Sequence, residues 1–158
     1  MTTDEKILPP DLIYIMYIRA GAKRVWDALT QSEFTRQFFF GRTVESDWKQ
    51  GSRWRLVMAD GKTDVDGEVL ESDPPRRLKL SWTVQWHHET RDLKPAIITY
   101  DLEETGEVTK LIMTQHNEGP TPQKLVEAGK QGWSLILSSL KSLLETGEAI
   151  IVEMKLPQ

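Results

Sequence analysis

The stretch GWSLILSSLKSLLETG, residues 132–147, determines how the rest of the chain must fold. Its large apolar residues recur at steps of three and four positions, which places them along one side of an α-helix. Gly147 stands just past the last turn, where a C-terminal cap is expected. A long helix with one apolar face needs an apolar surface to pack on. The apolar residues of this face are Trp133, Ile136, Leu137, Leu140, Leu143 and Leu144.

Part of that surface is predicted to be a β-hairpin in the first half of the chain. Asp60-Gly61 is a strong signal for a two-residue turn between antiparallel strands. In the register set by this turn, Arg55 opposes Asp66 on the solvent face. On the other face Trp54 opposes Gly67, which leaves room for the indole to lie over the sheet. Turn type, charge and side-chain size therefore favour the same register.

Two further segments predict strands of the same sheet. Residues 76–86 alternate apolar and polar side chains, which is typical of a strand with one dry and one wet face. Residues 98–114 predict a second hairpin that turns at Thr105-Gly106. In that register Asp101 opposes Lys110, and both side chains lie on the solvent side.

The N-terminal part predicts one strand and two short helices. Residues 12–19 (LIYIMYIR) are β-branched and aromatic without a breaker, so we expect a well-buried strand. Residues 22–31 and 32–40 have apolar residues at helical spacing. The full order is strand, two short helices, about six antiparallel strands and a long C-terminal helix. Because hairpins exclude a parallel crossover sheet, the prediction is an α+β fold with six or seven strands.

Length and composition limit the number of domains and the classes of partner that this chain can have. A chain of 158 residues fits one domain, residues 1–158, with a core of about 12–147 and an apolar tail, 148–158. The net charge of −4 argues against a nucleic-acid partner. There is no apolar run of roughly 20 residues, so membrane insertion is not expected. The acidic N-terminus does not resemble a signal peptide, and we expect a cytoplasmic protein.

Motifs for cofactor, metal or catalytic chemistry are incomplete. Residues 61–63 lack the first glycine of a phosphate-binding loop, and residues 62–73 lack the first and last ligands of a calcium loop. The adjacent histidines of residues 87–89 would point to opposite faces of a strand end, so a solvated loop is expected rather than a zinc site. His116 has no partner for a Ser-His-Asp arrangement, and Asp101 lies on the outer face. We therefore expect no cofactor, no metal and no enzyme activity.

The candidate functional residues are apolar. A strongly bent sheet and a straight helix cannot pack closely against each other over their whole length, so we expect a cavity between them. Three consecutive phenylalanines beside Gly41 cannot all face the core, and they are expected at the rim of that cavity. Apolar burial would provide affinity, with Gln115 or Tyr100 fixing the orientation of a ligand. The predicted lining comprises Trp54, Leu56, Met58, Leu80, Trp82, Tyr100, Met113, Gln115, Trp133 and Leu137, and the rim comprises Phe38, Phe39 and Phe40.

Four segments carry a resemblance to a known group of proteins. They are IxAxxxRVWDALT (residues 18–30), WxxGSxWR (48–55), DGxVLExxPPRRLxxSW (66–82) and GWxxxLSSLKxLLETG (132–147). They resemble the SRPBCC, or START-like, superfamily, and most closely its bacterial branch named for homology to the activator of the 90-kDa heat-shock protein ATPase. The resemblance implies a helix-grip fold, in which a sheet wraps around the last helix and encloses a hydrophobic cavity. Relatives bind sterols, lipids or polyketide-like molecules, and a few are cyclases.

Three functional hypotheses follow. The first is a non-enzymatic binder of a small hydrophobic or amphipathic molecule, such as a lipid, a sterol or an aromatic polyketide-like compound. The second is a protein-interaction module of the stress response, acting on a chaperone through an exposed patch outside a closed cavity. The third is a cyclase or hydrolase, for which His116 and Asp101 are the candidate polar residues. A monomer or weak homodimer is expected, with the apolar tail docked at a sheet edge or in a dimer.

Overall fold

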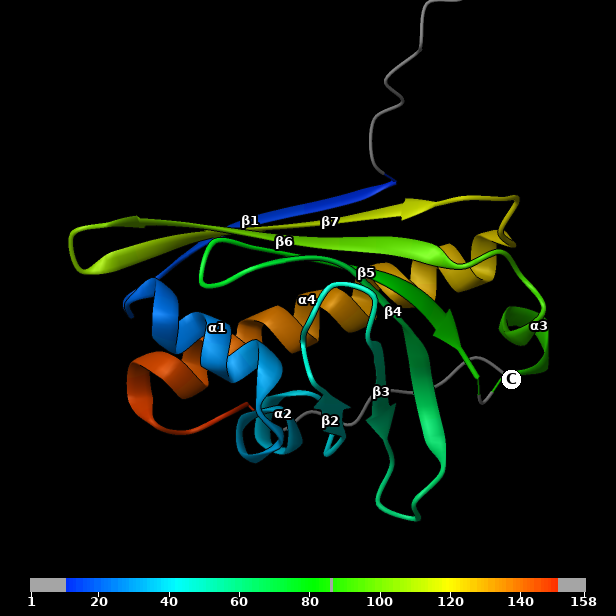
Figure 1. The fold of residues 1–158 in the computed structure, drawn as a ribbon, viewed down its shortest axis with the longest axis horizontal. Coiled ribbons are helices and arrows are strands. Elements are labelled where there is room, and N and C mark those ends of the chain that lie inside the picture. Colours follow the sequence, from blue (N-terminus) through cyan, green and yellow to red (C-terminus); the bar gives the residue numbers. More distant parts are fainter. Residues whose placement is uncertain (1–10, 86, 151–158) are drawn as a thin grey trace, which may run out of the picture.

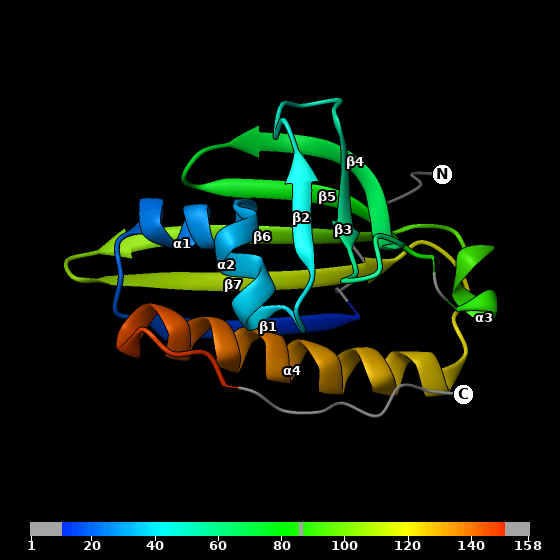
Figure 2. The ribbon, with the colours of Figure 1, turned by 90° about the horizontal axis from the view of Figure 1, so that it is seen from below.

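In the computed structural model, which describes residues 11–85 and 87–150, a curved antiparallel sheet wraps one long helix (Figures 1 and 2). Within those residues the sheet has seven strands in the spatial order β1-β7-β6-β5-β4-β3-β2. Every neighbouring pair is antiparallel, which confirms the predicted α+β, helix-grip arrangement. The strands are β1 Leu12–Ile18, β2 Thr43–Ser46, β3 Arg53–Val57, β4 Thr63–Asp73, β5 Arg77–Val84, β6 Ala96–Thr105 and β7 Val108–Asn117.

The helices all lie toward the concave side of the sheet (Figure 2). The two short helices predicted after the first strand are α1 Ala22–Thr30 and α2 Ser32–Phe38. A further short helix, α3 His88–Arg91, stands where a solvated loop was expected. The last helix, α4 Gln123–Thr146, runs beneath β1, β7 and β6 (Figure 1).

The apolar face of α4 is buried along its length, as its spacing predicts. Trp133, Ile136, Leu137, Leu140, Leu143 and Leu144 all belong to the core. Burying each such side chain contributes about 1.5–3 kcal/mol, so this face accounts for much of the stability. The helix ends at Gly147 in the left-handed conformation, with a φ of 86°, and its N–H donates to the Leu143 carbonyl over 2.9 Å. The predicted C-terminal cap is therefore confirmed.

The register of the first hairpin is confirmed, and the structure shows why it requires a glycine. Trp54 pairs with Gly67 across β3 and β4. A Cβ atom at Gly67 would collide with the backbone carbonyl oxygen of Ser81 on the next strand. The indole N–H of Trp54 crosses above this glycine and donates to the same Ser81 oxygen over 2.9 Å. The Trp54 side chain of β3 therefore contacts both β4, at Gly67, and β5, at Ser81.

The charges of this hairpin pair differently from the direct cross-strand prediction. Arg55 and Asp66 are register partners, but Arg55 reaches Glu45 of β2 over 3.2 Å. Asp66 instead lies 3.6 Å from Arg53. Strand twist favours diagonal contacts between long side chains, which accounts for the exchange of partners.

A bulge near the turn overturns the placement of Met58. The register shifts between Leu56 and Val57, so that Val57 pairs with Thr63. The extra residue changes which side chains face inward beyond that point. Met58 therefore lies outside β3, is only half-buried and does not line the cavity described below.

The second hairpin turns one residue later than predicted. Thr105 pairs with Val108, so the turn residues are Gly106 and Glu107. Asp101 consequently pairs with Ile112 rather than Lys110. Because side chains alternate with a period of two, this two-residue slip leaves every residue on its predicted face.

The first strand is an edge strand rather than a well-buried one. Its ends, Leu12 and Ile18, are buried, whereas the side chains between them alternate in exposure. Ile13, Ile15 and Tyr17 remain 55%, 55% and 59% exposed on the outer face of the sheet. Apolar composition alone could not distinguish this strand from a central one.

The chain beyond α4 turns back along the helix. The backbone N–H of Ile150 donates to the Ser139 hydroxyl over 3.1 Å, and this hydroxyl donates to the Ile150 carbonyl over 2.9 Å. The start of the predicted tail is thus held against α4. The remaining residues, 151–158, and Trp86 of the predicted strand lie outside the described residues.

Candidate functional site

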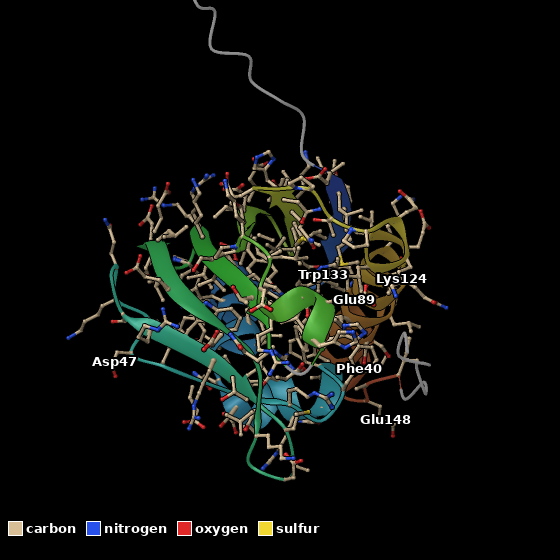
Figure 3. All side chains as sticks on the ribbon, turned by 90° about the vertical axis from the view of Figure 1, so that its right-hand side faces the viewer. Phe40, Asp47, Glu89, Lys124, Trp133 and Glu148 are labelled. Carbon is tan, nitrogen blue, oxygen red and sulfur yellow. The ribbon has the colours of Figure 1, made fainter. Side chains whose placement is uncertain are left out.

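A cavity of about 1030 Å³ separates α4 from the strand ends of β4 and β5. The loop that follows α2 and the segment that begins α3 also border it. Figure 3 looks toward it from the α3 end, with Trp133 of α4, Phe40 and Glu148 labelled around it. Ligand pockets for small molecules usually measure about 300–1,000 Å³, so this space has the size of a binding site.

One wall of the cavity is a cluster of aromatic rings centred on Trp82. Its ring centroid lies 5.3 Å from that of Trp133 and 6.1 Å from that of Phe39. Phe39 also meets Trp133 edge to face, with centroids 5.9 Å apart. Behind this wall Trp54 lies 4.9 Å from Trp82 and belongs to the buried core. Mutual contacts of this kind are worth about 0.5–1.5 kcal/mol each, so the wall is held in place by the protein itself.

Trp133 is further fixed by a hydrogen bond. Its indole N–H donates to the side-chain oxygen of Gln115 over 2.9 Å, and Gln115 in turn donates to Asn117. Neither Gln115 nor Tyr100 borders the cavity. Tyr100 is buried beside Trp133, and burial raises the pKa of its hydroxyl. The predicted role of these two groups in orienting a ligand is therefore not supported by their position.

A stretch of α4 with small residues also borders the cavity. Ala128, Gly129 and Gly132 all border the cavity. A Cβ atom built at Gly129 would have no atom within 4 Å. Gly129, which weakens the helix by about 1 kcal/mol relative to alanine, thus leaves space where it borders the cavity.

The three phenylalanines all border the cavity, but most of their surface is hidden. Phe38 ends α2 and is 2% exposed, and Phe39 is 8% exposed. Phe40 is half-buried and has a φ of 49°, and Gly41 follows with a φ of 76°. This left-handed pair turns the chain sharply after Phe39. Of the three, only Phe40 matches the expected rim position.

A polar corner lies beside the phenylalanine loop. Arg42 donates from Nε to Asp64 over 2.9 Å and from Nη1 to the Phe40 carbonyl over 2.8 Å. Both charged side chains border the cavity. Burial raises the pKa of the Asp64 carboxyl, although the hydrogen bond and charge of Arg42 oppose this shift. Within the described part of the chain, no donor reaches the Oδ1 atom of Asp64.

Sequence reasoning missed this corner. Alternation along β4 assigns Asp64 to the same side as Asp66, which is the solvent side. Its burial results from the loop that carries Arg42, a contact across 22 positions of sequence. The only sequence signal for the burial of Asp64 was its place directly before Val65, a buried residue next to an otherwise exposed turn.

An ion pair joins α3 to the start of α4. Lys124 of α4 lies 2.6 Å from Glu89 of α3, and Figure 3 shows the two side by side. The hydrogen bond from Lys124 lowers the pKa of Glu89. His87 precedes α3, is buried, and accepts at Nδ1 from the Glu89 N–H over 3.1 Å. His87 therefore caps α3 and borders the cavity rather than projecting into solvent.

The other predicted residues fall in two groups. His116 and Asp101, the residues named for a catalytic role, do not border the cavity, and Asp101 forms an ion pair with Arg77 over 2.7 Å. Among the described residues, no group of three histidines, cysteines or acidic residues could hold a metal ion. The remaining predicted lining residues pack in the core instead of facing the cavity, and they are Trp54, Leu56, Leu80, Tyr100, Met113 and Leu137.

A curved antiparallel sheet, a long helix in its grip and a large cavity between them define a helix-grip protein of the SRPBCC type. The chain belongs to the family described as activator of Hsp90 ATPase homolog 1-like protein, whose model matches residues 19–145. The resemblance carried by the four sequence segments is thereby confirmed. No helix in the described ranges is long and apolar enough to cross a bilayer.

Solved structures share this fold at low sequence identity. DynU16, from the dynemicin biosynthetic locus, has a TM-score of 0.72 and 24% identity over 89% of this chain and 49% of its own. The Aha1 dimer protein from Colwellia psychrerythraea has a TM-score of 0.69 and 19% identity over 87% of this chain and 98% of its own.

An HSP90 activator from Plasmodium falciparum has a TM-score of 0.69 and 19% identity, covering 84% of this chain and 94% of its own. None of the curated proteins compared with the sequence matches it. At such identities the structural likeness establishes the fold alone.

Proposed function

We propose that this protein binds one small hydrophobic or amphipathic molecule in the cavity between α4 and the sheet. The observation that carries the proposal is the combination of a volume of about 1030 Å³ with a wall of mutually packed aromatic rings. A lipid, a sterol or an aromatic polyketide-like compound has the size and the apolar surface to fill such a space.

The energetics favour an apolar ligand. Trp82 is only partly buried although it packs against the core, and it borders the cavity. Covering apolar surface contributes roughly 25 cal/mol per Å², so a ligand that covers Trp82 and the α4 wall gains without reordering the rings. Since Trp133 and Phe39 already hold Trp82, little conformational entropy is lost on binding.

A cavity-filling variant tests this proposal. In Gly129→Leu the new side chain enters open space, and leucine is the better helix former, so the fold is expected to survive. Binding of lipids, sterols and aromatic polyketides, measured by NMR shift perturbation and isothermal titration calorimetry, should weaken at least about tenfold for any compound bound by the wild type.

The matched control places the same side chain on the exposed face of α4. Ser138 is exposed and does not border the cavity, so Ser138→Leu should bind as the wild type does. If Gly129→Leu and Ser138→Leu bind every compound equally well, the cavity is not the binding site.

A second candidate function is a protein-interaction module, and the outer face of β1 favours it. Ile13, Ile15 and Tyr17 form an apolar stripe on an edge strand, a feature that often marks a protein contact. Since the family takes its description from an Hsp90 ATPase activator, a chaperone of that class is the partner to test.

The two candidates are separable by variants. Stimulation of a chaperone ATPase through the stripe should be lost in Ile15→Asp and retained in Gly129→Leu. Retention in Ile15→Asp together with loss in Gly129→Leu would instead connect any stimulation to the cavity.

A further inference from the structure

A second stripe of residues runs along α4 beside the one that packs in the core. Its residues are small or apolar, recur at steps of three and four positions, and all border the cavity. They are Leu125, Ala128, Gly132, Leu135 and Ser139. Both leucines are only partly buried, and a Cβ atom at the adjoining Gly129 would meet no described atom within 4 Å. This surface, called the cavity stripe below, is therefore incompletely covered by the described residues.

The chain that follows α4 leads onto the cavity stripe. From Gly147 the backbone turns back along the helix (Figure 2), and two hydroxyl groups of α4 hold it there. Ser142 donates to the Glu148 carbonyl over 2.7 Å. Ser139 donates to the Ile150 carbonyl over 2.9 Å and accepts from the Ile150 N–H over 3.1 Å. Ile150 borders the cavity and is 46% exposed, so the chain runs toward the N-terminal half of α4 where its description ends.

The residues that come next have the pattern of an amphipathic strand. Residues 150–156, IIVEMKL, place an apolar side chain at every second position, and Pro157 ends the run. Because Ile150 borders the cavity, a period of two assigns Val152, Met154 and Leu156 to the cavity side. The intervening residues, assigned to the solvent side, are Ile151, Glu153 and Lys155.

The length of this run fits the length of the cavity stripe. Ile150 lies beside Ser139, and an extended chain advances about 3.3 Å per residue, whereas a helix advances about 1.5 Å. Four further residues of strand therefore span about nine residues of helix, which brings Met154 beside Gly129. The two residues after Met154 reach the far end of the stripe. The apolar side of the run can thus follow the whole uncovered surface.

We propose that residues 151–156 dock on the cavity stripe as an extended strand, with Val152, Met154 and Leu156 toward the cavity, and that a molecule entering the cavity must displace them. The docking is a property of the chain itself, whereas the competition rests on the proposed binding function. The gain from burying three apolar side chains is comparable with the conformational entropy lost when six residues are ordered. The docking is therefore reversible, so a ligand can replace the segment.

Disulfide trapping in the full chain tests the docking, because the sequence contains no cysteine of its own. A redox buffer of reduced and oxidised glutathione should join Gly129→Cys to Met154→Cys at least about tenfold faster than Gly129→Cys to Glu153→Cys. The reason is that a disulfide needs Cβ atoms about 4 Å apart, and only cavity-side residues of the strand approach α4 so closely.

The matched control moves the helix cysteine to the other side of α4. Gln131 is exposed, does not border the cavity and lies about 200° around the helix from Gly129. Gln131→Cys should therefore react with Met154→Cys at least about tenfold more slowly than Gly129→Cys does. Equal rates for the three pairs are the result for an undocked segment, and they overturn the proposal.

A second measurement tests the competition by placing aspartate on either side of the strand. Met154→Asp puts a charge against the cavity stripe and should release the segment, whereas Ile151→Asp puts the same charge on the solvent side. The probe is 8-anilinonaphthalene-1-sulfonate, whose fluorescence rises in an apolar site. Its Kd for Met154→Asp should be about threefold or more below its Kd for Ile151→Asp and for the wild type, because the competing segment has left the cavity.

The outcomes separate the docking from the proposed function. Equal probe affinities of Met154→Asp and Ile151→Asp, with the disulfide preference present, overturn the competition while the docking stands. If no protein binds the probe, and the lipid and sterol panel also fails, the proposed function and the competition are both overturned. The disulfide rates decide the docking in that case as well, since they require no ligand.

Discussion

Trp133 and Gln115 join the long helix to β7 through one hydrogen bond of 2.9 Å between the indole N–H and the side-chain oxygen. The bond sets the angle of the indole and so determines which edge of Trp133 faces the cavity. A glutamine that seemed suited to contact a ligand thus serves to position an aromatic wall.

Replacing Gln115 by leucine should destabilise the protein by about 1–3 kcal/mol, because the buried indole N–H loses its acceptor. Urea denaturation of Gln115→Leu measures this loss. Trp133→Phe removes the donor, so the double variant should be less destabilised than the sum of the two single variants. Strict additivity would show that the bond contributes nothing to stability.

The contact between β4 and β5 at Gly67 leaves no space for a side chain. Gly67→Ala should lower the free energy of unfolding by about 3 kcal/mol or more, because the new Cβ collides with backbone that also accepts from Trp54. Gly129→Ala is the matched control and should raise stability by up to about 1 kcal/mol through helix propensity. Chemical denaturation of both variants tests the expected opposite signs.

Two isoleucines of β1 should respond differently to the same substitution. Ile18 is fully buried, and Ile18→Ala should cost about 2–5 kcal/mol. Ile15 is 55% exposed, and Ile15→Ala should cost less than about 1 kcal/mol. A large loss at Ile15 in thermal or urea unfolding would mean that the outer stripe is covered in solution, for instance by a second copy of the chain.

The Asp64 carboxyl should impose a pH dependence on stability. Burial, partly opposed by Arg42, raises its pKa above the ordinary value of 3.8, so the folded protein retains this proton to a higher pH than the unfolded chain. The contribution of Asp64 to stability therefore falls as the pH rises from the unfolded pKa through the folded pKa.

The comparison with Asp64→Asn isolates this effect. The free energy of unfolding of the wild type minus that of the variant should decrease with rising pH across that window and level off above it. The other titratable groups that border the cavity, Arg36, His87 and Glu148, are the same in both proteins. A difference that increases with pH would mean that Arg42 outweighs burial.

The sequence predicted the frame of the fold because that frame follows from local periodicity. The apolar stripe of α4, its cap at Gly147 and the pairing of Trp54 with Gly67 are all set by residues near one another or by one strong turn. The assignment to a branch of the superfamily likewise rested on contiguous sequence segments.

The residues that form the cavity wall could not be predicted in the same way. Trp133, Trp82 and the phenylalanines all border it, since large aromatics next to the helix face have few other places to go. Leu80 and Leu137 satisfied the same rule of facing inward, yet they pack in the filled part of the core. Which inward positions meet a void depends on where the sheet bends away from α4, and periodicity does not encode that.

The bulge after Leu56 and the later turn of the second hairpin show the same limit. A single inserted residue ends the predicted alternation before Met58, whereas a two-residue slip leaves the facing of Asp101 unchanged. A register error of one residue thus moves side chains to the other face of the sheet, whereas an error of two residues does not.

The double hydrogen bond between Ser139 and Ile150 involves only the main chain of Ile150, so the isoleucine side chain at the border of the cavity is replaceable. The chain contains no cysteine, and Ile150→Cys would accept a thiol-reactive fluorophore at that single position. The fluorescence of such a dye would report whether the cavity is occupied, because the dye is attached at the cavity border and leaves the aromatic rings unchanged.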